Sequence, residues 1–304
     1  QEGILLPAAH LLTALISGLG ALAAHAITRR LSPNRMIQLA AGFLVGFSPL
    51  WVRNGHYSTV DIPLATLCLW TMLKTVEVWQ KTALPKRWDA ALLGALTGLT
   101  IAAKYNGVLI ALPVALVLSR NLRGHFRNTA GLLILAGLSA SVIFILFNPF
   151  LFLDWATARE HLLSRTSEVA TGRLGFFMDN GWLFHLRHSL GEGYGAGLLL
   201  LALLGGAWTC FPSQFRSGGW LLTLFTLLFG FVMGRSHAAF QRHLLPVIPF
   251  LAVLSARGFE GVGVTLARTV ARGPRLALYI FVGLASAGPP IYGSVRHDWV
   301  MAQG

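Results

Sequence analysis

Residues 89–118 read DAALLGALTGLTIAAKYNGVLIALPVALVL. Two apolar runs, 89–103 and 106–118, lie on either side of the polar tripeptide Lys104-Tyr105-Asn106. A helix needs about 20 apolar residues to cross the hydrocarbon core of a bilayer, and a lysine at its centre costs about 2.5–3.5 kcal/mol. We therefore expect two half-length or tilted helices that meet at one membrane face, rather than one long helix with an interior lysine.

The composition of the whole chain agrees with a membrane protein. Of its 304 residues, 55% are hydrophobic and only 12% are charged, and the mean hydropathy is +0.64. Soluble domains carry about twice this share of charged residues. These values exclude an ordinary cytosolic enzyme, a disordered chain and a disulfide-built secreted domain. Cys68 and Cys210 both lie in apolar runs and indicate neither a disulfide nor a metal site.

Apolar runs recur along the chain and predict an all-α, polytopic transmembrane helical bundle with about ten membrane segments. The longest connection is an outer loop, residues 148–194. The ten predicted segments are 4–27, 36–52, 62–79, 89–103, 106–118, 129–147, 195–211, 219–234, 244–257 and 275–292.

The distribution of basic residues predicts the orientation of these segments. A net charge of +13 would suit a nucleic-acid-binding protein if the chain were soluble, but membrane proteins concentrate Lys and Arg in short cytoplasmic loops. We therefore expect no nucleic-acid partner. With the N-terminus outside, 15 of the 24 basic residues fall on the inner side: Arg29, Arg30, Arg35, Lys74, Lys81, Lys86, Arg87, Arg120, Arg123, Arg127, Arg216, Arg257, Arg268, Arg272 and Arg275.

A second group of ionisable residues lies in the short outer connections, against this bias. Such groups at a membrane face are candidates for function. The alternative is that they are interfacial anchors whose long side chains reach lipid phosphates. The cations are Arg53, Lys104, Arg235 and Arg242, accompanied by His56, Asp61, His237 and His243.

The outer loop 148–194 predicts a helix that begins after Asp154, a residue type suited to a helix N-cap. Apolar residues recur at heptad spacing on one face of this helix, so it could lie on the bilayer surface, although packing against the membrane segments is an equal alternative. These apolar residues are Trp155, Leu162 and Val169.

No complete metal site is visible in the sequence. His185 and His188 could share a helix face, but a third ligand is lacking. Asp61 and His56 could together hold a divalent cation, yet two ligands do not make a site. We therefore assign no metal ligand and no cofactor, and leave a divalent cation open.

Four stretches, in this order, resemble the membrane-embedded GT-C glycosyltransferases, and specifically their protein O-mannosyltransferase and aminoarabinose-transferase branch. The likeness covers about residues 1–260 and leaves 261–304 as an inner loop, a last transmembrane helix and a tail. The stretches are Ser48-Pro49-Leu50 through the HYSTVDIP of 56–63, GLTIAAKYN at 98–106, Asn148-Pro149-Phe150, and RHLLPVIP at 242–249.

The resemblance implies transfer of a sugar from a polyprenyl-phosphate donor to a hydroxyl acceptor on a lipid, glycan or protein, with inversion at the anomeric carbon. It also implies that Lys104 contacts the donor phosphate. His243 stands where the family usually has an aromatic residue. Family members begin with one further helix and an outer loop that carries an acidic catalytic residue. We therefore expect this chain to correspond to a fragment that starts at the second helix and lacks the main catalytic acid.

The chemistry needs a proton acceptor for the hydroxyl and fixed cations for the departing phosphate. Asp61 is the candidate catalytic residue, either orienting the acceptor or assisting the base, although it could simply be a helix N-cap before Pro63. Lys104 and Arg242 are the first candidates for phosphate binding. The remaining candidates for substrate binding are His56, Arg53, Arg235, His243 and Tyr105, with core packing the alternative for the tyrosine and Asn106 as a further pocket residue.

The sequence thus predicts an integral membrane glycosyltransferase, in the bacterial inner membrane, with its active face outside the cytoplasm. A secondary transporter or lipid flippase is the main rival, since a helix broken at Lys104 could line a translocation path. A non-catalytic membrane subunit is a third possibility.

Overall fold

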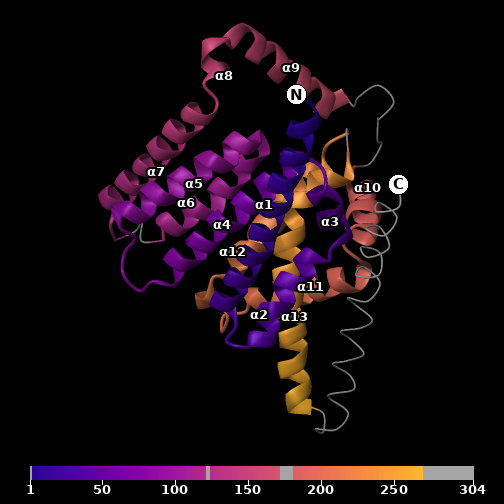
Figure 1. Cartoon of the computed structure of the whole chain (residues 1–304). Helices are drawn as coiled ribbons and strands as arrows, with labels where there is room; N and C mark the ends of the chain where they lie inside the picture. The colour runs from indigo at the N-terminus through magenta and orange to yellow at the C-terminus, as the bar shows by residue number, and fades with distance from the viewer. Residues whose placement is uncertain (1, 121–123, 172–180, 238, 270–304) are drawn as a thin grey trace.

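The computed structural model describes residues 2–120, 124–171, 181–237 and 239–269, and within these ranges it contains helices and no strand (Figure 1). The helices are α1 (Glu2–Leu31), α2 (Arg35–Gly46), α3 (Pro49–Gly55), α4 (Asp61–Gln80), α5 (Arg87–Ala103), η1 (Tyr105–Ile110), α6 (Ala111–Leu118), α7 (Phe126–Phe147), α8 (Phe150–Leu153), α9 (Trp155–Thr171), α10 (Gly181–Phe184), η2 (His185–Glu192), α11 (Ala196–Cys210), η3 (Phe215–Ser217), α12 (Gly219–Gly234), η4 (Gln241–Val247) and α13 (Ile248–Thr269).

The all-helical prediction is confirmed, whereas the count of ten membrane segments is not. Among the described residues, three helical stretches are long and apolar enough to cross a bilayer, and the number rises to five if two bent pairs of helices each count as one span. The single stretches are Leu5–Leu31, Phe126–Phe147 and Gln241–Thr265. The predicted segment 275–292 lies outside the described residues.

In two of the predicted segments, a proline interrupts the regular α-helix. Segment 36–52 is divided into α2 and α3, which meet at an angle of 57°. Pro49 begins α3 and disfavours the helical conformation for the residue before it, so Ser48 is extended and the first helix ends. Segment 244–257 begins earlier than predicted, at Gln241. Its first turns form the 3₁₀-helix η4 rather than an α-helix, because Pro246 lacks the N–H that an α-helix would need.

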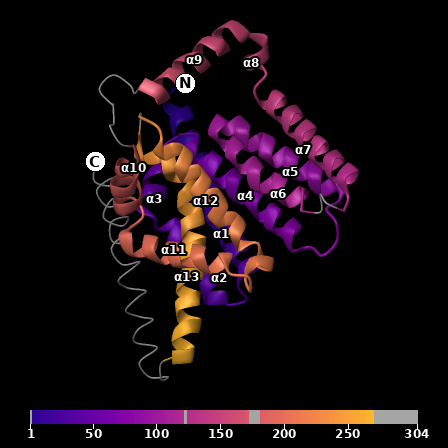
Figure 2. The same ribbon diagram turned by 180° about the vertical axis from the view of Figure 1, so that it is seen from behind.

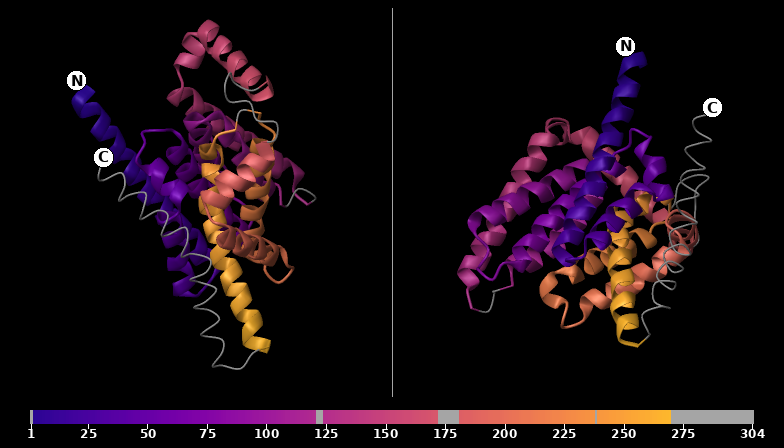
Figure 3. Two further views of the ribbon diagram at one scale, coloured as in Figure 1. Left: turned by 90° about the vertical axis from the view of Figure 1, so that its right-hand side faces the viewer. Right: turned by 60° about the horizontal axis from the view of Figure 1, so that its bottom comes forward.

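Helix α4 lies at the centre of the bundle, where Leu64, Leu69 and Met72 are fully buried. Figures 1 and 2 show α5, α6 and α7 on one flank of the molecule and α10 and α11 on the opposite flank. The first turns of α1 extend beyond the neighbouring helices (Figure 3), and Leu5 and Leu11 are accordingly more than 60% exposed. Leucines this exposed are suited to contact with lipid rather than water.

The break predicted at Lys104 is present. Helix α5 ends at Ala103, Lys104 is extended, and the chain then turns back through η1 into α6. Gly107 lies so close to the backbone of Thr100 that a side chain at this position would overlap the carbonyl group. The missing side chain therefore permits the tight reversal that places Lys104 at a helix end.

Helices α5 and α7 pack at very short range. A Cβ atom on Gly94 would overlap the backbone of Ala136, and one on Gly98 would overlap that of Ala140. The step from Gly94 to Gly98 along α5 matches the step from Ala136 to Ala140 along α7, so the two helices run parallel. Small residues at this spacing let helix backbones approach closely in a membrane, where van der Waals packing holds helices together.

Charged residues gather at both ends of α4. At the C-terminal end, Asp89 accepts a hydrogen bond from Lys81 at 2.8 Å and lies 3.3 Å from Lys74, while Arg30 and Glu77 form an ion pair at 2.5 Å. We call this the Lys81 end. The N-terminal end of α4 lies near Lys104 and is called the Lys104 end. The charge count predicts opposite membrane sides for these two groups, and in the structure they lie at opposite ends of α4.

Part of the outer loop 148–194 forms the helix predicted after Asp154, whose carboxylate accepts a hydrogen bond from the Thr157 N–H at 3.3 Å. Trp155 is 57% exposed and Leu162 is 44% exposed. These two side chains are not buried against the bundle. This agrees with the bilayer-surface alternative; the side chain of Val169 is not described.

Candidate functional site

Three segments far apart in the sequence bring Asp61, Lys104 and Arg242 together at the Lys104 end. Asp61 begins α4, Lys104 follows α5, and Arg242 lies in the first turn of η4. The Lys104 ammonium donates to Asp61 Oδ1 at 2.7 Å, and Arg242 Nε lies 4.0 Å from Asp61 Oδ2. The carboxylate therefore has a cation at each oxygen.

Burial differs sharply among these three side chains. The side chain of Asp61 is 4% exposed, that of Lys104 is 20% exposed and that of Arg242 is 50% exposed. Asp61 is thus held inside the protein by its contact with Lys104, whereas Arg242 reaches outward. Charge interactions strengthen as water is excluded, so the inner pair is the stronger of the two contacts.

Helix α4 begins at Asp61 itself, after Val60. The carboxylate is therefore not the N-cap of α4, and the N-cap alternative is wrong. Its position in the first helical turn is still favourable, because the N-terminal end of a helix carries partial positive charge. The helix end and Lys104 together make this position favourable for the Asp61 carboxylate, which lies at the base of the site.

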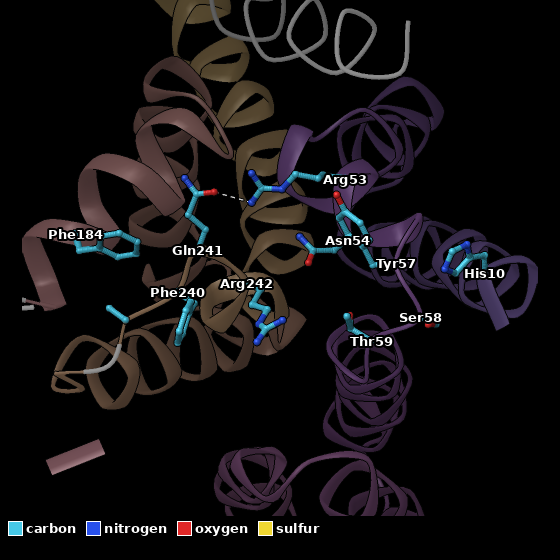
Figure 4. A pocket seen from close by; sticks show the side chains of 11 residues that line it. His10, Arg53, Asn54, Tyr57, Ser58, Thr59, Phe184, Phe240, Gln241 and Arg242 are labelled. Carbon is cyan, nitrogen blue, oxygen red and sulfur yellow. Dashed lines mark hydrogen bonds between the residues drawn. The ribbon is translucent and has the colours of Figure 1, made fainter. Parts of the chain in front are cut away.

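A cavity of about 720 Å³ lies beside this cluster and opens at the same end of the bundle. Figure 4 shows Arg242 and Phe240 on one side of it, and Ser58, Thr59 and His10 on the other. The volume is within the usual range for ligand sites. The lining residues are His10, Arg53, Asn54, Tyr57, Ser58, Thr59, Phe184, Ala239, Phe240, Gln241 and Arg242.

Two arginines line the cavity and both have defined partners. Arg53 donates to Gln241 Oε1 at 2.6 Å, drawn as a dashed line in Figure 4, and Gln241 donates in turn to the His188 carbonyl at 3.2 Å. The guanidinium of Arg242 lies over the ring of Phe240, 5.5 Å from its centroid. Neither guanidinium has a carboxylate within direct hydrogen-bond distance among the described residues, so both retain donors for an anion.

Three of the other predicted residues lie outside the cavity lining. His56 is exposed, and its Nδ1 lies 2.8 Å from the Val52 carbonyl. Arg235 is exposed at the end of α12, with its guanidinium over Phe231. Tyr105 is 59% exposed, so the core-packing alternative for it is wrong.

His243 and Asn106 lie deeper. The ring of His243 lies within electrostatic range of Lys104, His185 and Arg242, and it packs edge-on against Phe240 with centroids 5.3 Å apart. Asn106 is buried, and its Oδ1 has no hydrogen-bond partner among the described residues. His237 is half-buried in the connection between α12 and η4.

Sequence reasoning missed several lining residues, above all His10 and Gln241. His10 lies inside the first apolar run, and an ionisable residue within such a run is itself a signal of function. Gln241 precedes the RHLLPVIP stretch by one residue and carries no charge, so no feature of the sequence marks it. Thr59 has a buried hydroxyl with no partner among the described residues.

The described residues contain no group of three or more His, Cys, Asp or Glu side chains that could hold a metal ion. His185 Nδ1 lies 2.8 Å from the Ser189 hydroxyl, and His188 pairs with Glu192 at 2.9 Å. The two histidines are therefore engaged with separate partners, and they form no shared site in the part of the chain that is described.

Comparisons with known proteins agree with this architecture. The family model of dolichyl-phosphate-mannose-protein mannosyltransferases matches residues 5–152. The crystal structure of ArnT from Cupriavidus metallidurans bound to undecaprenyl phosphate aligns with a TM-score of 0.59 and 16% identity, over 97% of this chain and 58% of that one. The resemblance to GT-C glycosyltransferases is confirmed.

Two further structures share the GT-C-like fold. The apo form of the same ArnT aligns with a TM-score of 0.54 and 13% identity, over 94% of this chain and 60% of that one. The oligosaccharyltransferase of Archaeoglobus fulgidus, in complex with Zn and sulfate, aligns with a TM-score of 0.58 and 14% identity, over 94% of this chain and 40% of that one. The chain thus spans less than two thirds of each of these proteins. No curated protein matches it significantly in sequence.

Proposed function

We propose that this GT-C-like chain is part of an integral membrane glycosyltransferase that moves a sugar from a polyprenyl-phosphate donor to a hydroxyl acceptor, with inversion, on the extracytoplasmic face. The observation that carries the proposal is the convergence of Asp61, Lys104 and Arg242, from three separate segments, beside one cavity. Phosphate binding in ArnT, whose structure holds undecaprenyl phosphate, supports the same donor class here.

The first requirement of the reaction is a place for the departing phosphate. As the glycosidic bond breaks, negative charge builds up on the phosphate, and cations already in position stabilise it without reorganisation. Lys104, Arg242 and Arg53 supply three positive charges against the single negative charge of Asp61. We propose that Arg242 and Arg53 contact the phosphate from the cavity, and that Lys104 does so as the anion approaches.

The second requirement is a correctly held lysine. Lys104 lies between two helices, where an unpartnered lysine side chain would adopt many conformations. Its 2.7 Å contact with the buried Asp61 fixes it before substrate binds. We propose that Asp61 acts as a positioning residue for Lys104, which is narrower than the catalytic role predicted from sequence.

The third requirement is a proton acceptor for the hydroxyl. Among the described lining residues, His10 is the one with an imidazole, the side chain most often used as a general base. It lies across the cavity from Arg242 (Figure 4), as an acceptor site opposite a phosphate site requires. Thr59, with its unpartnered hydroxyl, is a further hydrogen-bonding group for sugar or acceptor.

The remaining elements of the proposal concern its setting. We propose the bacterial inner membrane as the location, membrane lipid as the immediate surroundings, and a lipid, glycan or protein as the acceptor. We also propose that four residues outside the cavity lining contact the substrate, either after their side chains move or because the lipid donor is long enough to reach them. They are His56, Arg235, His243 and Tyr105. We propose a divalent cation only as a group that the reaction can use but does not require. The Zn in the oligosaccharyltransferase structure supports testing for one. Residues 1–260 are proposed as the GT-C module, although α13 continues through this boundary to Thr269.

The test uses purified full-length protein with a panel of polyprenyl-phosphate sugars, with and without divalent cations. Lys104→Ala should lower transfer about 10²–10³-fold, the usual cost of removing one group that stabilises the transition state. Asp61→Asn should also lower transfer, because the ammonium of Lys104 is then no longer held by a carboxylate. The matched control is Lys81→Ala, which breaks the ion pair with Asp89 at the opposite end and should leave transfer unchanged. Wild-type turnover in both test variants would overturn the assignment, and substrate movement across vesicles without sugar transfer would favour the transporter.

A further inference from the structure

A second cavity lies between α5 and α7, at the opposite end of α5 from Lys104. Its volume is about 350 Å³. Helix α5 has 17 residues and is therefore about 25 Å long, so this cavity and Lys104 lie at opposite ends of a helix of that length. It is lined by Arg87, Arg127, Asn128, Gly131, Leu132 and Leu135.

The parallel packing of α5 and α7 places both helix N-termini beside this cavity. The partial positive charges of two helix ends thus add to the charges of Arg87 and Arg127. Both arginines are exposed, and neither forms an ion pair or side-chain hydrogen bond with a described residue. The nearest acid of α5, Asp89, is buried and already paired with Lys81 and Lys74. The cavity therefore has unsatisfied positive charge at its mouth.

The rest of the cavity and its surroundings are apolar. Leu132 and Leu135 form its inner wall, and the outward face of α7 continues from it with Ile134 and Leu138, both at least 60% exposed. Next to the two arginines in the sequence, Trp88 is 74% exposed and Phe126 is 67% exposed, and exposed aromatic residues are typical of the membrane–water interface. A soluble anion would not use this apolar path, whereas an acyl chain would.

We propose that this cavity binds the phosphate group of an anionic phospholipid, with the acyl chains lying along α7. Arg87 and Arg127 would contact the phosphate, Asn128 would hydrogen-bond to it, and the two guanidinium groups would repel the ammonium of a zwitterionic headgroup. The charge distribution predicted from sequence places this end at the inner leaflet. The proposal needs no sugar transfer and is independent of the proposed function.

The experiment measures retention of phosphatidylglycerol, against phosphatidylcholine, by the full chain in native mass spectrometry. The test variant Arg87→Gln/Arg127→Gln should bind phosphatidylglycerol about 20–30-fold more weakly, since each basic residue near a lipid surface contributes about fivefold. The control variant Arg29→Gln/Arg35→Gln removes the same charge from exposed positions at the same end and should lose less than about threefold. Equal losses in the two double variants would overturn the proposal.

A second variant keeps the charge and fills the cavity. Gly131 lines the cavity, and a Cβ atom at this position would meet no other atom within 4 Å, so Gly131→Leu should occupy part of the cavity and lower phosphatidylglycerol retention at least fivefold. Unchanged retention in this variant would contradict a bound lipid. Inorganic phosphate is the last arm: if it raises the thermal midpoint of lipid-free protein as much as phosphatidylglycerol does, the site takes free anions and the lipid assignment is wrong.

Discussion

At the scale of single residues, the site depends on one ion pair that joins positions 61 and 104. The carboxylate lies almost entirely out of solvent, which is unfavourable for a charge unless a partner is close. Lys104 supplies that partner, and Arg242 stands 4.0 Å away as a second. The same contact therefore contributes to folding and holds a cation ready for substrate, and the two contributions can be measured separately.

Lys104→Met should destabilise the protein by about 2–3 kcal/mol, because it leaves the Asp61 carboxylate buried beside Arg242 alone. The cost is smaller than for a wholly buried pair, since the lysine is partly exposed. The double variant Asp61→Asn/Lys104→Met has no buried charge to leave unpaired and should recover at least half of this loss. Thermal unfolding in detergent provides the comparison, and transfer should be lost in both variants. Equal stability of the single and double variants would contradict the buried-charge argument.

Gln241→Ala should raise the KM for the donor about three- to tenfold with little change in kcat. Gln241 fixes the Arg53 guanidinium at 2.6 Å, and a freed arginine must be ordered again when the phosphate binds. Steady-state kinetics on the full-length enzyme measures both constants. In an Arg53→Ala background, Gln241→Ala should raise KM no further, so a further rise in that background would indicate a role other than positioning Arg53.

At the scale of elements, the backbone geometry around α5 determines where Lys104 lies. The reversal at Gly107 ends α5 at the right place, and the close contact with α7 holds its axis. Sequence predicted the break, because a polar tripeptide interrupts two apolar runs. It did not predict that α5 and α7 would run in contact, because the small residues that allow it are common throughout the chain. The apolar pattern of 36–52 does not reveal its division into α2 and α3, because Pro49 begins a new helix without ending the run of apolar residues.

Gly94→Leu should separate α5 from α7, because the added side chain would overlap the backbone of Ala136, which cannot move aside as a flexible side chain can. We expect a loss of at least about 3 kcal/mol of stability, at the upper end of overpacking effects. Thermal unfolding again gives the measurement. Gly137→Leu, on α7 with open space around its Cβ position, is the control and should be tolerated. If both variants unfold alike, the close contact between α5 and α7 is not the reason.

At the scale of the whole molecule, two charged ends lie on opposite sides of an apolar bundle, joined by α4. Counting basic residues assigns the described groups to two different ends, since the rule depends on charge along the chain and not on packing; which end faces the cytoplasm stays a prediction. The same reasoning could not show that Asp61, Lys104 and Arg242 would meet, because their meeting depends on how α4, α5 and η4 pack together. It also missed His10, Gln241 and Phe184, whose place in the cavity depends on tertiary structure alone.

The sidedness of the two ends leads to the last prediction, which tests the proposed extracytoplasmic site directly. In a Cys210→Ser background, which removes the exposed native thiol and leaves Cys68 buried, a single cysteine is placed at one end or the other. Ser58→Cys lies in the exposed lining of the cavity, and Thr82→Cys lies in the exposed connection at the Lys81 end. A membrane-impermeant maleimide added to intact spheroplasts should label Ser58→Cys fully and Thr82→Cys only after the membrane is opened, because the basic end should face the cytoplasm. Labelling of the background protein must stay near zero in both conditions for the comparison to hold. The reverse pattern would place Lys104, Arg242 and their cavity on the cytoplasmic side, where a site for an extracytoplasmic lipid-linked donor could not act.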